Sequence, residues 1–569
     1  MYDFRSGDWL VQPSLHRATN GSEVVRLEPK VLAVLMHLVE HAGEPVSKKA
    51  LLEGVWPDTT VEEVALARSI SELRRLLGDD AHNPRYIETI PKGGYRWIAS
   101  VTEGSPNVGP SIAVLPFENA TGDPQNEYLV DGITELMIHR LSEFPGLRVM
   151  ARSTVFRFRA KQIDPLQVGR QLGVGAIVSG RITVLGARLS IDAELIDTRD
   201  GVQLWGERFE RDLRGIPDAQ EEIAGAISEH LRVKLSASRK EHLTRRYEID
   251  PDTYRLYLQG RFWWNKRPQQ GFMKGLEFFQ QAITRDPLFA LAYSGIADVY
   301  ATLGSWELGL MWPREAMPRA KAAAERAIEL DDQLADPYAS LGYILLHYDW
   351  DWEESSKAFT RAIELNPNCV NAHHWVSHLH MAMRNPDQSL DESLKTAALD
   401  PLDLIATLHL GWHYWLVREP EYVIEESRKA ATLEPNSPWP PFFGGLGYEL
   451  QSEFDSAAEK FRQARARAPA LTYTAAALAH VLGSKGAHDE ALAVLDDFDR
   501  IAITQYVPAY DRAIVYIGVG DIDHAFEWLD KTFDERSGWL AYLQVEPRLD
   551  PIRSDPRFGK LCQRVGLRN

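Results

Sequence analysis

The chain has 569 residues, of which 44% are apolar and 25% are charged, and its formal net charge is −18. This length predicts two to four domains, and the acidic balance excludes a protein that coats nucleic acid or anionic membrane over its whole surface. The two cysteines, Cys369 and Cys562, stand in no ligand spacing and suggest neither a disulfide framework nor a Zn site. Because the sequence shows neither a signal-peptide pattern nor a long uncharged apolar run, we expect a cytoplasmic chain without a membrane partner.

Two shifts in composition divide the sequence into three segments. Residues 102–110 are rich in Gly, Pro and Ser, and residues 237–246 are rich in Arg and Lys. We therefore predict a multidomain α+β chain, with an N-terminal winged helix-turn-helix, a central α/β domain and a C-terminal all-α solenoid. The predicted domains cover residues 1–103, 110–236 and 250–569.

The first segment combines short strands, three helices and a terminal hairpin. Strands are predicted over residues 4–10, 14–17 and 24–27, and helices over residues 29–41, 48–55 and 61–77. Two β-prone runs over residues 86–98 flank Pro91-Lys92-Gly93-Gly94, which is typical of a tight hairpin with a lysine at its tip. A lysine on a turn is usually only a solvated surface charge. Whether this lysine has a function therefore depends on what the preceding helices form.

The third predicted helix has two distinct faces. Leu66, Ile70, Leu73 and Leu77 recur at helical spacing and predict a core-facing stripe. Steps of 100° place four residues on the opposite face, with Arg74 on a flank: Arg68, Ser71, Glu72 and Arg75. Two helices, a turn and an arginine-bearing helix predict a helix-turn-helix, and the hairpin after it would be a wing.

The combination LEPKVLAVLMHLVEHAGEPVSKKALLEGVWPD, VEEVALARSISELRRLLGDD and YIETIPKGGYRW resembles the OmpR/PhoB-type winged-helix domain. The variant is the one found in one-component regulators such as the CadC activators. The resemblance implies that double-stranded DNA is a partner, with the third helix in the major groove and the wing on the flank. It implies base or sugar contacts by Arg68, Ser69 and Glu72, phosphate contacts by Arg74 and Arg75, and wing contacts by Lys92 or Arg96.

Charge around the predicted DNA-binding helix is balanced. Residues 61–97 contain six basic and six acidic side chains. Because DNA affinity depends on the number of phosphates neutralised, one copy should bind weakly, and we expect a homo-oligomer on repeated sites. RNA polymerase is a further candidate partner.

The middle segment is predicted to be α/β. Strands are expected over residues 112–117, 147–150, 176–184, 188–197 and 202–208, and helices over residues 128–144, 165–172 and 219–235. SIAVLPFENATGDPQNEYLVDGITELMIHRLS and QLWGERFERDL resemble the α/β domain of TolB-like proteins, which is sometimes labelled cyclase-like. No catalytic residues can be carried over, and we interpret Asp123 as a loop residue and Asp131 as a helix cap. We therefore expect neither an enzyme nor a cofactor.

The third segment repeats with a period of 34 residues. Pro367, Pro401, Pro435 and Pro469 each close a similar helix end, and this period is typical of tetratricopeptide (TPR) helix pairs. We predict about eight pairs, with an insertion around residues 304–318. Stacks of this kind present a concave surface, which we expect to bind a protein or peptide.

Four histidines, at positions 373, 374, 378 and 380, lie close together in this segment. His374 and His378 are one helical turn apart and would share a face, but a closed metal site needs more ligands than this run offers. Helix packing or surface exposure is the favoured interpretation, and no metal is predicted.

The sequence as a whole predicts a sequence-specific DNA-binding transcriptional regulator whose repeat array binds a protein partner or mediates self-assembly. The main alternative is a TPR scaffold whose winged helix does not act on DNA. A nucleotide cyclase in the middle domain is a third hypothesis.

Overall fold

The computed structural model describes residues 4–13, 16–21, 23–56, 63–91, 93–103, 110–159, 164–185, 188–212, 216–231, 250–266, 269–305 and 308–567. The chain divides into two units, residues 1–109 and residues 110–569. Among the described residues, no helix combines the length and the apolar character needed to cross a bilayer.

The first unit begins with an antiparallel sheet in the order β4-β3-β2-β1-β8. Its strands are β1 (Phe4–Ser6), β2 (Trp9–Gln12), β3 (Arg17–Asn20), β4 (Glu23–Arg26) and β8 (Val101–Glu103). The single strand predicted over residues 4–10 is in fact two strands, because Gly7 turns the chain with φ at +56°. The strand predicted over residues 14–17 lies partly outside the described residues, and β3 begins at Arg17.

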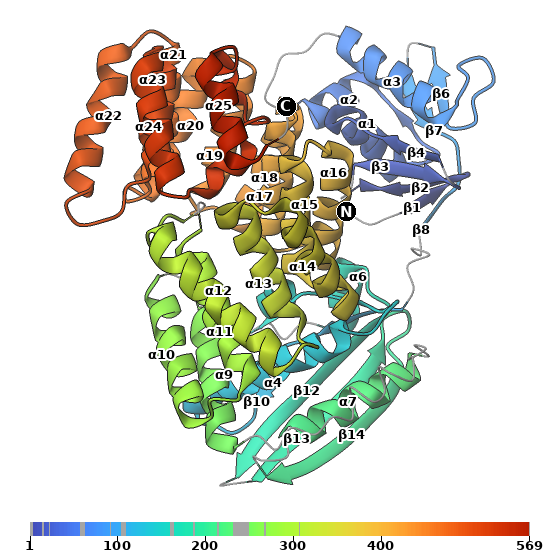
Figure 1. Cartoon of the computed structure of the whole chain (residues 1–569). Helices are drawn as coiled ribbons and strands as arrows, with labels where there is room; N and C mark the ends of the chain where they lie inside the picture. Colours follow the sequence, from blue (N-terminus) through green and yellow to red (C-terminus); the bar gives the residue numbers. More distant parts are fainter. Residues whose placement is uncertain are drawn as a thin grey trace. The chain divides into compact units, whose positions relative to one another are not determined.

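Three helices and a second sheet complete this unit (Figure 1). The helices are α1 (Pro29–Glu40), α2 (Lys48–Val55) and α3 (Glu63–Leu77), and the sheet, in the order β5-β7-β6, contains β5 (Pro45–Val46), β6 (Ile87–Ile90) and β7 (Gly94–Trp97). Ser47 begins α2 by accepting a hydrogen bond from the Ala50 amide at 3.1 Å. The predicted three helices and hairpin are therefore confirmed.

The second unit begins with a mixed sheet in the order β11-β9-β12-β13-β14. Its strands are β9 (Ser111–Val114), β11 (Arg148–Val149), β12 (Ala176–Leu185), β13 (Arg188–Asp197) and β14 (Gln203–Asp212), and the two-residue strand β10 (Glu118–Asn119) pairs with β12. Strands β9, β11 and β12 are parallel, whereas β12 to β14 form the predicted meander. The predicted turn at residues 186–187 lies outside the described residues. In the described parts of this region, four α-helices accompany the sheet: α4 (Glu127–Ser142), α5 (Arg152–Val155), α6 (Pro165–Leu172) and α7 (Ile216–His230).

A helical repeat array of the TPR type follows, and Figure 1 shows its helices stacked in succession. Within the described residues, helices α9 to α24 form eight consecutive pairs, and two short 3₁₀ helices and one further α-helix follow them. The bounds are α9 (Pro251–Asn265), α10 (Gln269–Arg285), α11 (Ala290–Leu303), α12 (Pro313–Leu330), α13 (Ala335–Ile344), α14 (Trp352–Leu365), α15 (Val370–Ala382), α16 (Pro386–Leu399), α17 (Leu404–Leu416), α18 (Pro420–Leu433), α19 (Trp439–Leu450), α20 (Phe454–Arg467), α21 (Thr472–Ser484), α22 (His488–Ile501), α23 (Ala509–Val519), α24 (Ile522–Asp534) and α25 (Pro556–Val565). The predicted insertion corresponds to the long connection between α11 and α12.

Small residues allow the paired helices to approach each other. In three pairs a glycine of the first helix faces a phenylalanine of the second: Gly260–Phe279, Gly342–Phe359 and Gly445–Phe461. A Cβ atom on any of these glycines would come within 2.4–2.6 Å of the ring, which is closer than van der Waals contact permits. The small residues therefore make room for the aromatic rings between the paired helices, as the TPR sequence pattern predicts.

The α/β sheet and the repeat array are joined within the second unit. One hydrophobic core runs from Ile112 to Ile344. The Asn368 side chain donates to the carbonyls of Ser142 and Leu147, both at 2.8 Å. Asp400 accepts a hydrogen bond from Thr154 Oγ1 at 2.7 Å. The repeats thus hold the α/β domain through both apolar and polar contacts.

Candidate nucleic-acid interface

One face of α3 is open to solvent along its whole length. Val64, Arg68, Ser71 and Arg75 occur at helical spacing, and all four side chains are exposed. Within the described part of the chain, the guanidinium of Arg68 has no hydrogen-bond partner. This face presents an apolar group, a hydroxyl and two guanidinium groups, which are the side-chain types that read base edges and grip phosphates.

The opposite face of α3 packs into the core of the first unit. Leu66, Ile70, Leu73 and Leu77 are all buried, as their spacing predicts. Ser69 belongs to the same buried side, with 8% of its surface exposed, and its hydroxyl donates to the Ala65 carbonyl at 3.1 Å. Its hydroxyl is therefore not presented to a groove, in contrast to the role that the family resemblance implies.

Glu72 and Arg75 form an ion pair at the edge of the exposed face. Arg75 donates to both carboxylate oxygens, at 2.9 and 2.5 Å. This hydrogen bonding holds the pKa of Glu72 below its ordinary value, and the charge of Arg68 acts in the same direction. Both partners are accessible, so the pair can open when a phosphate competes for the guanidinium.

The environment of Arg74 differs from that of the exposed Arg68 and Arg75. Its guanidinium donates to the Ile87 carbonyl at 2.8 Å and to Thr89 Oγ1 at 2.9 Å, and it lies 3.9 Å from the carboxylate of Asp79. The side chain of Asp79 is fully buried and accepts hydrogen bonds from the amides of Arg85, Tyr86 and Ile87. Arg74 therefore joins α3 to the first strand of the hairpin and is largely occupied inside the protein.

The hairpin that follows α3 is fixed by Gly94. Its φ is +119°, and a Cβ atom here would come within 2.0 Å of the Val46 carbonyl oxygen, so only glycine fits. Arg96 lies opposite Glu88 across the two strands, with 3.5 Å between Nη1 and Oε2. Lys92, the predicted tip contact, lies outside the described residues.

Two further groups near this interface were missed by sequence reasoning. Lys49 at the start of α2 has 83% of its side chain exposed, and Val64 at the start of α3 is 72% exposed. Continuing the helical spacing backwards from Arg68 by four residues would have identified Val64.

Comparison with protein families agrees with this geometry. Residues 21–97 match a family described as "Transcriptional regulatory protein, C terminal". Residues 108–226, for which the sequence suggests a TolB-like domain, match "HilA/YgeH-like transcriptional regulator, second domain". Both matches are to domains of transcriptional regulators. The resemblance of the first segment to OmpR/PhoB-type winged helices is thereby confirmed.

Individual relatives match different parts of the chain. "Transcriptional regulator HilA" of Salmonella typhimurium is 27% identical over 400 residues, which cover 68% of this chain and 69% of that protein. "Transcriptional activator CadC" of Escherichia coli is 37% identical over 109 residues, or 19% of this chain and 21% of that protein. "Putative adenylate cyclase 3" of Rhizobium meliloti is 34% identical over 224 residues, or 39% of this chain and 38% of that protein. The chain thus spans little more than a third of the last relative.

Proposed function

We propose that this regulator binds double-stranded DNA through the exposed face of α3 and controls transcription at the sites it selects. The observation that carries the proposal is that Arg68, Ser71 and Arg75 lie together on the solvent side of the third helix of a winged helix. In helix-turn-helix proteins this helix enters the major groove. The matches to families of transcriptional regulators support the same conclusion.

Individual roles follow from the environment of each side chain. Arg68 is the base-reading residue, since its fork can bond both acceptors of guanine. Arg75 releases the Glu72 carboxylate and binds a phosphate instead. The freed carboxylate of Glu72 accepts a hydrogen bond from a cytosine amino group. Arg96 and Lys92 grip the flank from the hairpin, whereas Arg74 holds the hairpin against α3. Ser69 serves helix packing.

The second unit supplies the protein contacts in this proposal. The α/β domain over residues 110–236 acts as a rigid spacer or sensor, and the array over residues 250–569 binds a protein or peptide on its concave face. Because acidic and basic residues balance around α3, two or more copies bind together on repeated sites. Copies bound at the promoter would recruit RNA polymerase.

No catalytic activity is included in the proposal, although one relative carries the name of an adenylate cyclase. In the α/β domain, Asp123 caps a short 3₁₀ helix by accepting from the Gln125 amide. Asp131 is not the predicted helix cap; it is buried within α4 and bound by Arg159. Both carboxylates therefore have structural partners. Formation of cyclic AMP from ATP and Mg²⁺ by the purified chain would show that this part of the proposal is wrong.

Two variants of the full chain test DNA binding. Sites are first selected from random duplexes at low salt, and affinities are then measured for every single base-pair change. We expect Arg68→Ala to lose roughly 1–3 kcal/mol of discrimination at one position. Arg75→Ala should weaken binding to all sequences and reduce the salt dependence by about one phosphate contact.

The control is Arg500→Ala, which removes a positive charge of similar exposure to that of Arg75 from the repeat array and should leave the affinity unchanged. A chain that selects no duplex at low salt would contradict the proposal and favour the scaffold alternative.

A further inference from the structure

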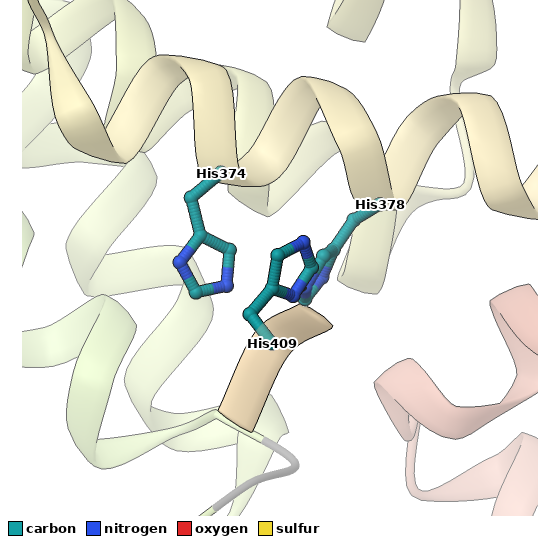
Figure 2. A group of neighbouring side chains, drawn as sticks. All are labelled: His374, His378 and His409. Atoms are coloured by element: carbon teal, nitrogen blue, oxygen red, sulfur yellow. The ribbon is translucent and has the colours of Figure 1, made fainter. Parts of the chain in front are cut away.

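Three histidines from two neighbouring repeats meet inside the array. His374 and His378 lie one turn apart on α15, and His409 comes from α17 (Figure 2). One nitrogen from each ring can be chosen so that the three atoms lie within 4.8 Å of one another. His409 follows His378 by 31 residues, close to one repeat length, so the repeat brings it to this place.

The hydrogen bonds around His409 determine which of its nitrogens carries the proton. The hydroxyl of Ser377 donates to the His374 carbonyl at 2.6 Å, and that of Ser393 donates to the Ser389 carbonyl at 2.8 Å. Both hydroxyl oxygens also contact His409 Nε2, at 2.5 and 3.1 Å. Because their protons are engaged, Nε2 is the donor, and Nδ1 of His409 keeps its lone pair.

The same reasoning applies to His378. His347 Nδ1 donates to the Tyr343 carbonyl at 3.1 Å, so His347 Nε2 accepts from the Tyr542 hydroxyl at 2.7 Å. The Tyr542 oxygen then accepts from His378 Nδ1 at 2.9 Å, so Nε2 is the ring nitrogen of His378 that is turned toward His409. It lies 3.3 Å from His409 Nδ1.

We propose that His374, His378 and His409 form a binding site for a divalent transition-metal ion of the Zn²⁺ type. A separation of 3.3 Å between two ring nitrogens is what a tetrahedral ion with bonds of about 2.0–2.1 Å requires. The remaining ring nitrogens of His378 and His409 are held by Tyr542, Ser377 and Ser393, as metal-bound imidazoles usually are.

The third ligand must move to complete the site. The rings of His374 and His409 have centroids 4.1 Å apart and are tilted by 31°, so His374 must rotate to aim a nitrogen at the ion. All three histidines line a cavity of about 220 Å³ that gives space for this rotation. Half of the other residues in its wall are aromatic, among them Trp375, Trp412, Trp439, Phe443 and Tyr473.

The ligand set defines the class of ion and of its fourth ligand. Three imidazoles suit Zn²⁺, Cu²⁺ and Ni²⁺, whereas Mg²⁺ and Ca²⁺ prefer oxygen ligands. Because imidazoles are uncharged, the bound ion keeps its double positive charge. The fourth position faces the aromatic cavity and would take water, hydroxide or an anionic small molecule. This inference does not depend on DNA binding.

The test uses the full chain without a histidine tag, treated with chelator and then titrated with Zn²⁺ against a chromophoric competitor. We expect one tightly bound Zn²⁺ per chain, and the visible spectrum of a four-coordinate ion when Co²⁺ is substituted. His374→Gln and His409→Gln should each weaken binding at least tenfold. Ser393→Ala, which removes a hydrogen-bond partner of a ligand, should weaken it by about 10- to 100-fold.

The matched control is His380→Gln on the same helix, which should bind Zn²⁺ like the unaltered chain. His374 is half-buried and lines the cavity, so its variant should fold, as circular dichroism can check. Absence of stoichiometric binding, or equal binding by His374→Gln and His409→Gln, would overturn the proposal. A six-coordinate Co²⁺ spectrum would also overturn it.

Discussion

Three arginines of α3 differ in what surrounds them, and this difference sets their roles. Arg68 and Arg75 are exposed, whereas Arg74 has only 14% of its side chain exposed. The sequence placed Arg74 on a flank of the helix but could not reveal its partners. Thr89 and Asp79 meet Arg74 only because the chain folds back after α3.

Arg74→Ala should therefore destabilise the first unit. The substitution removes the donors to the Ile87 carbonyl and Thr89 and takes a positive charge from beside buried Asp79. We expect a loss of about 1–3 kcal/mol, measured as reduced protection of residues 63–97 in hydrogen exchange of the full chain. Arg75→Ala, the neighbouring control, should leave protection unchanged. If Arg74→Ala leaves hydrogen-exchange protection of residues 63–97 unaltered but weakens DNA binding, Arg74 contacts phosphate instead of stabilising the fold.

At the scale of elements, the hairpin between β6 and β7 depends on Gly94, because the adjacent strand β5 leaves no room for a side chain at this position. Gly94 has a positive φ, and the Val46 carbonyl of β5 occupies the space of a Cβ atom. The pair of glycines in the sequence predicts a turn, but not that a third strand approaches it. The strand β5 has only two residues, and no sequence pattern predicted it.

Gly94→Ala should loosen the hairpin by about 2–4 kcal/mol, since backbone strain and a steric clash add together. Hydrogen exchange over residues 86–97 measures this effect. Gly43→Ala is a matched control, because Gly43 also has a positive φ, of +87°, but has no neighbouring atom within 4 Å. Its cost should be only about 1–2 kcal/mol. Equal effects of the two substitutions would contradict the role assigned to the Val46 carbonyl.

The joint between α5 and the repeats should respond to pH. Burial raises the pKa of Asp400 to about 7, and the nearby Asp403 adds to the shift. The folded chain thus holds this proton more tightly than the unfolded chain, so the contribution of Asp400 to stability is fully present below about pH 4 and is lost as the pH rises to about 7. Asp400→Asn should reduce the loss of unfolding free energy between pH 5 and pH 8 by on the order of 1–3 kcal/mol.

Urea unfolding at the two pH values tests this expectation. Exposed Asp332→Asn is the control and should leave the pH dependence unchanged. An unchanged pH dependence in Asp400→Asn would show that Asp400 is ionised in the folded chain at pH 5.

For the whole molecule, periodicity was the most informative property of the sequence. The 34-residue spacing predicted eight helix pairs, and the spacing in α3 predicted its buried and exposed faces. Contacts between distant segments were not predictable in this way. Asn368 binds the carbonyls of Ser142 and Leu147, and His409 joins two histidines of another repeat. Side chains of this kind become visible only when the repeats are stacked.

The central claim is that the exposed face of α3 lies in the major groove of DNA. A photoreactive benzophenone amino acid in place of Ser71 tests it most directly, with the full chain bound to a selected duplex and position 332 as the control. We predict crosslinks from position 71 to bases within the selected site and none from position 332. Binding of the duplex without crosslinks from position 71 would contradict the account.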